Sequence, residues 1–159
     1  MANNKHNWQF QVSSIKSLFS MIKKLISVNP FGIDALSIIR VFAGILMLLH
    51  GKMVFDSQVM NGMGESLSKD MGMPFPLLMA YLAKGSEFFG GLLFALGLLT
   101  RFVAIPLSIT MAVAAFVAHH GQITGEGEHA FLFLLIFAAF FFIGSGKWSV
   151  DYLLKRRKK

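Results

Sequence analysis

Long apolar stretches, separated by shorter polar segments, make up most of this chain. The longest, Leu77 to Leu99, has 23 residues, of which only four are polar or charged. As a helix that rises about 1.5 Å per residue it would be about 34 Å long, enough to cross the roughly 30 Å hydrocarbon core of a bilayer. The pattern therefore predicts a transmembrane helix.

Three further apolar stretches fit the same interpretation. They are residues 33–50, 102–118 and 130–143. The last is short for a span, so we extend it to 128–148, with its tryptophan at the membrane interface. Glycine, proline and polar residues predict loops at 51–76 and 119–128, and Thr100-Arg101 predicts a tight turn. We therefore expect an all-α transmembrane four-helix bundle with up-down topology.

The segment before the first span has a different pattern. From Ile15 to Ile26, apolar residues recur every three or four positions, and lysines and serines occupy the other face. This spacing predicts an N-terminal amphipathic helix at the membrane interface, and a loosely ordered tail is the alternative. The chain would then consist of a basic amphipathic segment 1–32, a membrane domain 33–151 and a basic tail 152–159.

The composition agrees with a membrane protein, because 55% of the residues are hydrophobic and only 14% are charged. If both termini lie on one side, eleven of the 15 Lys and Arg residues fall there, and only Lys52 and Lys69 fall in the opposite loops. This asymmetry predicts cytoplasmic termini. The cations would contact lipid headgroups of the bilayer rather than nucleic acid, since no stacking aromatic residues accompany the basic tail. The absence of cysteine excludes disulfides and Cys-ligated metals.

Three ionisable residues, Arg40, Lys84 and Glu87, fall within the predicted spans. A charge at membrane depth costs on the order of 3 kcal/mol on insertion scales, so such residues are usually paired, hydrated or functional. Helix geometry puts Arg40 within about 5 Å of the height of Glu87, and Lys84 about one turn from it. We therefore expect an Arg40–Glu87 ion pair and a polar pocket between adjacent helices. The pocket would hold a proton or the polar head of a lipid-soluble substrate, unless the charges only fix the helix register.

Four of the five histidines fall at the predicted outer ends of the spans. They are His50, His119, His120 and His129, with Glu126 and Glu128 beside them. Imidazoles at one mouth could relay protons or bind a metal or haem, or they could simply end helices in water. Their spacing matches no zinc or haem signature, so we predict no metal site. The five methionines of the first loop could bind Cu(I), although interfacial packing is their more usual role.

Several segments together resemble the DoxX family of small four-span membrane proteins. In chain order they read LSIIRVFAGILMLLHGKMVF, MGMPFP, GSEFFGGLLFALGLLTRF and GEHAFLFLLIFAAFFFIGSGKWSVD. The resemblance implies a protein of the bacterial plasma (inner) membrane that is linked to redox metabolism. Some members are subunits of thiosulfate:quinone oxidoreductases, and others associate with oxidative-stress and sulfur-handling enzymes. The positions that it carries over are Arg40, His50, Gly51, Glu87, Gly90, Gly91, Gly97, Arg101, Glu128 and Gly146.

Our first interpretation is a membrane subunit of a quinone-linked oxidoreductase, in which Glu87 relays protons. The catalytic residues would be Glu87, His50 and Arg40, and the ligand-binding residues Lys84, Gly91, His120 and Glu128. The cofactor stays unidentified, with quinone as the candidate and haem or copper as alternatives. Two other functions remain open: a non-catalytic anchor for soluble redox enzymes, and a small-solute transporter that would need a homo-oligomer to form a pore. The residues do not decide whether the chain itself is catalytic.

Overall fold

The computed structural model describes residues 13–20 and 35–157, and every regular element in them is a helix. The chain forms two compact units, Met1–Ile33 and Asp34–Lys159. In the first unit, residues 13–20 are helical with exposed side chains. They cover the beginning of the predicted amphipathic helix, whose remainder lies outside the described residues.

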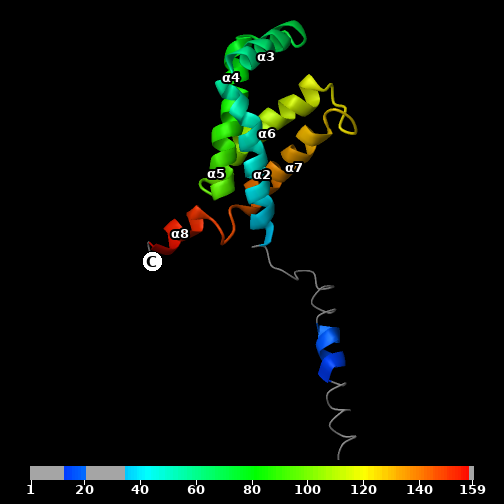
Figure 1. The fold of residues 1–159 in the computed structure, drawn as a ribbon, viewed down its shortest axis with the longest axis vertical. Coiled ribbons are helices and arrows are strands. Elements are labelled where there is room, and N and C mark those ends of the chain that lie inside the picture. The colour runs from blue at the N-terminus through cyan, green and yellow to red at the C-terminus, as the bar shows by residue number, and fades with distance from the viewer. Residues whose placement is uncertain (1–12, 21–34, 158–159) are drawn as a thin grey trace, which may run out of the picture. The chain divides into compact units, whose positions relative to one another are not determined.

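The second unit is an all-helical bundle (Figure 1). Its elements are α2 (Leu36–Gly51), η2 (Lys52–Phe55), α3 (Ser57–Lys69), α4 (Pro76–Gly85), η3 (Ser86–Gly90), α5 (Gly91–Leu96), α6 (Thr100–Ala112), η4 (Val113–Ala118), α7 (Glu128–Ile143) and α8 (Val150–Arg157). Among the described residues, three continuous helical segments are long and apolar enough to cross a membrane, namely Leu36–Phe55, Pro76–Leu96 and Thr100–Ala118. The apolar helix α7 is shorter. The prediction of an all-α membrane protein is therefore confirmed.

Consecutive apolar helices run in opposite directions. The end of α2 lies beside η3, where Gly51 abuts the backbone of Phe88. The start of α6 lies beside the end of α7, where Arg101 donates a hydrogen bond to the Phe142 carbonyl. We call this last region the Arg101 end of the bundle. The opposite region, where η4 leads into the loop before α7, is the His119 end.

Small residues let α2 pack directly on the second apolar segment. A Cβ added to Gly44 would collide with the backbone of Ala95. On the other helix, a Cβ added to Gly91 would collide with the backbone of Leu48. The two backbones therefore approach closely, which is how small residues stabilise helix pairs in membranes.

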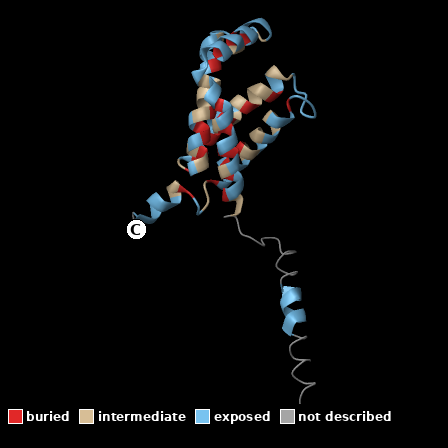
Figure 2. Cartoon of the chain, in the orientation of Figure 1, coloured by how far each residue is buried: buried red, intermediate tan, exposed pale blue. Residues whose placement is uncertain are grey.

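The core lies where α2, α5, α6 and α7 meet. Phe94 forms edge-to-face contacts with Phe137 and Phe140, at ring-centroid distances of 5.0 and 5.4 Å. Ala104 and Leu107 of α6 belong to the same cluster and are fully buried. Many residues on the outside of the bundle are exposed, as Figure 2 shows, and many of their side chains are large and apolar. An apolar exterior of this kind fits contact with lipid.

The segment 51–76, predicted as a loop, contains η2 and α3, so that prediction is wrong. Asp56 caps the start of α3, because its carboxylate accepts hydrogen bonds from two backbone N–H groups. Met60, Gly64 and Leu67 are buried and share one face of this helix, which packs on α4. The glycines of the segment favour turns locally, but the buried face makes it helical.

Other boundaries differ by a few residues. The tight turn precedes Thr100, where α6 begins, because Gly97 and Leu99 have left-handed backbone angles (φ 67° and 52°). The last apolar helix ends well before residue 148, because Gly144 leaves the helical conformation with φ 86°. Two π-helical turns, η3 and η4, interrupt the second and third apolar segments, and the hydrophobic pattern did not predict them.

Candidate functional site

Lys84 and Glu87 form an ion pair within the second apolar segment. The distance from Lys84 Nζ to Glu87 Oε2 is 2.7 Å, and the two side chains are only 15% and 5% exposed. Ala80, one α-helical turn before Lys84, and Gly91, which follows the turn η3, are also buried. Each charge therefore has an opposite charge at hydrogen-bond distance, which offsets part of the cost of placing it in an apolar helix.

Glu87 belongs to the π-helical turn η3. Such turns insert an extra residue into the α-helical repeat and are frequent at functional sites. In the same turn, Ser86 donates a hydrogen bond to the Ala83 carbonyl at 2.9 Å. The Ser86 hydroxyl also lies 2.8 Å from the Thr110 hydroxyl of α6. A polar contact thus joins η3 to α6 one residue away from the buried carboxylate.

The end of α2 covers another side of η3. Gly51 is buried against the backbone of Glu87 and Phe88, which leaves no room for a side chain at that position. His50 precedes it in the chain and is exposed. An exposed imidazole and a buried carboxylate therefore lie on adjoining turns of two helices.

The expected Arg40–Glu87 ion pair is wrong. Arg40 is 1% exposed, and its Nη1 donates to the carbonyls of Phe94 at 2.6 Å and Ala95 at 2.8 Å. Its Nη2 donates to the Trp148 carbonyl at 2.6 Å. The last carbonyls of a helix lack partners within it, so the end of α5 offers acceptors to a buried cation. Long side chains in helices also point back toward the N-terminus, which here is the Arg101 end, away from Glu87.

Asp151 lies near Arg40 and its carbonyl partners, and the sequence did not identify it as a site residue. Its carboxylate accepts hydrogen bonds from the N–H groups of Leu99 at 3.0 Å and Thr100 at 3.4 Å, so it caps the start of α6. Its own N–H donates to the Gly97 carbonyl at 3.1 Å. Gly97 has no room for a side chain, because a Cβ there would collide with the guanidinium of Arg40.

The other predicted site residues do not join the buried ion pair. His120 and Glu128 are exposed at the loop between η4 and α7, and α7 packs on α6 and η4. His119 Nδ1 lies 3.9 Å from Glu126 Oε2. Within the described residues, no three side chains of the metal-binding types His, Asp and Glu gather closely enough to hold a metal ion. Gly91 contacts the backbone of α2, which makes it a packing residue.

Known proteins give matches to most of the bundle. The family model described as DoxX matches residues 35–120, from the start of α2 to the loop after η4. A Haemophilus influenzae protein named "uncharacterized protein" is 31% identical over 126 residues, which cover 73% of this chain and 87% of that protein. A Bacillus subtilis protein named "putative oxidoreductase CatD" is 28% identical over 123 residues, covering 77% and 88%. No solved structure matches significantly.

Proposed function

The chain belongs to the DoxX family, and we propose that it is a membrane subunit of a quinone-linked oxidoreductase. One observation carries the proposal: the Lys84–Glu87 pair puts a hydrogen-bond donor and a proton acceptor together inside an apolar helix. The Bacillus subtilis relative carries the name "putative oxidoreductase", which supports a redox role.

The chemistry of the pair suits the head of a quinone, which carries carbonyl oxygens on an apolar ring and tail. Lys84 has three N–H donors, and its bond to Glu87 uses one of them. The others can hold a carbonyl oxygen, and the ammonium charge stabilises negative charge that develops on it. Leu82 and Phe89 on the same segment are exposed, so an apolar ligand can reach the helix from the lipid.

Reduction of a quinone takes up two electrons and two protons, with the electrons supplied by a soluble redox protein. In this chain Glu87 is the group beside the ligand that gives or takes a proton. His50 exchanges protons with water at the adjoining end of α2, as histidines do in proton relays. Lys84 and Glu87 are thus the binding and proton-transfer groups, and Arg40, whose donors bond to carbonyls elsewhere, holds the fold together.

Quinone binding to the purified chain tests this site. We expect Lys84→Met combined with Glu87→Gln to weaken binding of decylubiquinone at least about tenfold, since a hydrogen bond to a charged group contributes about 1.5–3 kcal/mol. The matched control is Lys69→Met with Glu65→Gln, which removes an exposed pair at 3.2 Å on α3. Unchanged affinity in the first variant, or equal losses in both, would rule out the site.

We also propose that the Arg101 end faces the cytoplasm of the plasma (inner) membrane, because the Lys and Arg residues outside the spans concentrate on that side. The chain has no cysteine, so single cysteines can report topology. In intact cells, an impermeant maleimide should label Gln122→Cys and spare Leu154→Cys. The reverse labelling pattern would show the opposite orientation.

A further inference from the structure

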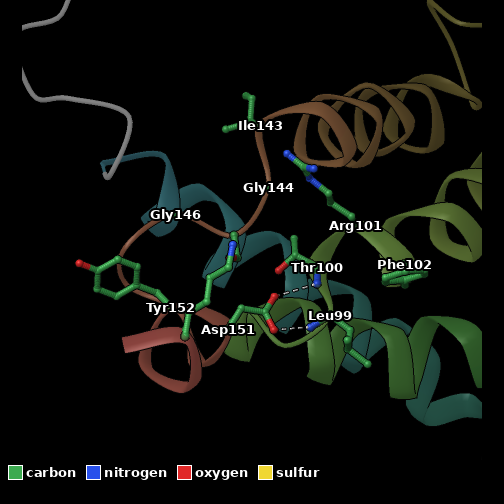
Figure 3. A pocket seen from close by; sticks show the side chains of 11 residues that line it. Leu99, Thr100, Arg101, Phe102, Ile143, Gly144, Gly146, Asp151 and Tyr152 are labelled. Carbon is green, nitrogen blue, oxygen red and sulfur yellow. Dashed lines mark hydrogen bonds between the residues drawn. The ribbon is translucent and has the colours of Figure 1, made fainter. Parts of the chain in front are cut away.

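A cavity of about 490 Å³ lies at the Arg101 end, outside the Lys84–Glu87 site (Figure 3). The start of α6, the glycine-rich segment after α7 and the helix α8 enclose it. Because an apolar helix begins here and another ends here, the cavity sits at the level where hydrocarbon gives way to headgroups. The exposed Trp148 at this end is typical of that level.

Two cations and one anion line the cavity. Arg101 and Lys155 carry the positive charges, and Asp151 carries the negative charge. The Asp151 carboxylate is already engaged with the backbone N–H groups of Leu99 and Thr100. One positive charge remains in excess, which complements the single negative charge of a phosphodiester.

Thr100 supplies a hydroxyl that lacks a partner. The residue is 1% exposed, and its Oγ1 forms no hydrogen bond within the described part of the chain. It lines the cavity and lies between Arg101 and Asp151 in Figure 3. Arg101 uses one N–H for the Phe142 carbonyl at 3.2 Å and has further donors. The hydroxyl itself is inaccessible in this structure, so the Thr100 side chain would have to rotate before it could donate to a phosphate oxygen, and the cost of leaving it unpaired favours that rotation.

The cavity also has apolar walls that open outward. Phe102 and Ile143 line it, and they are 73% and 44% exposed. Both belong to apolar helices, so their outer sides face the hydrocarbon of the membrane. A free phosphate ion would make no use of these side chains, whereas the acyl chains of a lipid would lie on them.

We propose that this cavity binds the phosphate of an anionic phospholipid headgroup. Arg101 and Lys155 contact the phosphate oxygens, the Thr100 hydroxyl joins them when its side chain rotates toward the cavity, and the acyl chains run along Phe102 and Ile143. The site shares no residue with the quinone site, so either proposal can fail without the other.

Native mass spectrometry of the full chain in a neutral detergent, with dioleoyl phosphatidylglycerol as the probe, tests the proposal. Arg101→Gln combined with Lys155→Gln should raise the dissociation constant of the first bound lipid about tenfold, because the phosphate then loses two charge-assisted hydrogen bonds. The matched control, Arg156→Gln with Arg157→Gln, removes the same charge from α8 without touching the cavity. It should change the dissociation constant less than about twofold, because neither side chain lines the cavity and exposed charges that make no direct contact contribute little.

A second variant keeps the test valid if loss of Arg101 disturbs the fold. Ser145→Phe fills the cavity without changing the charge, and it should weaken the first lipid to a similar extent. Equal weakening by the two cation pairs would show general attraction to the basic helix and overturn the proposal. Displacement of the lipid by millimolar inorganic phosphate would overturn the lipid assignment, because the site would then take the free ion.

Discussion

Arg40 connects three parts of the chain through one guanidinium. It starts from α2 and reaches the final carbonyls of α5 and the Trp148 carbonyl just before α8. A planar fork with several donors can span these acceptors, and the single ammonium of a lysine cannot. The sequence showed that a charge is buried here, because its position in an apolar stretch is plain. It could not show the partner, because that depends on the direction of the side chain.

Replacing Arg40 should therefore cost stability and leave the quinone site intact. We expect Arg40→Gln to reduce the free energy of unfolding by about 3 kcal/mol, since it leaves buried carbonyls without their charged donor. Arg40→Lys should lose less. Thermal unfolding in detergent measures the effect, with the exposed Lys52→Gln as control. If the variant had normal stability but no longer bound quinone, Arg40 would be a ligand-binding residue and its structural role would be contradicted.

The apolar helices were predictable because the length of an apolar stretch fixes the length of a span. The predicted span Leu77–Leu99 became Pro76–Leu96, and its end moved because Gly97 takes a left-handed conformation. The helix α3 was missed because its glycines suggested turns, although Met60 and Leu67 already had helical spacing. In the first case the exception lies in the backbone of one residue, and in the second the apolar spacing was informative but the glycines obscured it.

The π-helical turns left no mark on the hydrophobic pattern. An extra residue in a turn shifts the following residues by roughly 100° around the axis. In an almost wholly apolar segment this moves few polar groups, so periodicity cannot detect it. The turn η3 nevertheless decides how Glu87 lies relative to Gly91 and the rest of α5. The sequence showed that Lys84 and Glu87 lie close together within a span. It did not show that Glu87 belongs to a π-helical turn.

Along the bundle, the polar groups separate into distinct regions. The exposed histidines lie at the His119 end, and the Arg40 and Asp151 contacts lie at the Arg101 end. The aromatic cluster around Phe94 packs next to the Arg40 contacts. That this is a membrane protein was predictable, because the conclusion rests on the apolar residues of the whole chain taken together. The separation of Arg40 from Glu87 was not, since it follows from individual side-chain contacts.

Photolabelling with an azido-quinone, mapped by mass spectrometry of the digested chain, locates the quinone directly. The label should fall on Pro76–Leu96 around η3 and on the end of α2 that faces it, and excess decylubiquinone should prevent it. Label confined to α7 or α8, or label that decylubiquinone does not displace, would contradict a quinone site at Lys84 and Glu87.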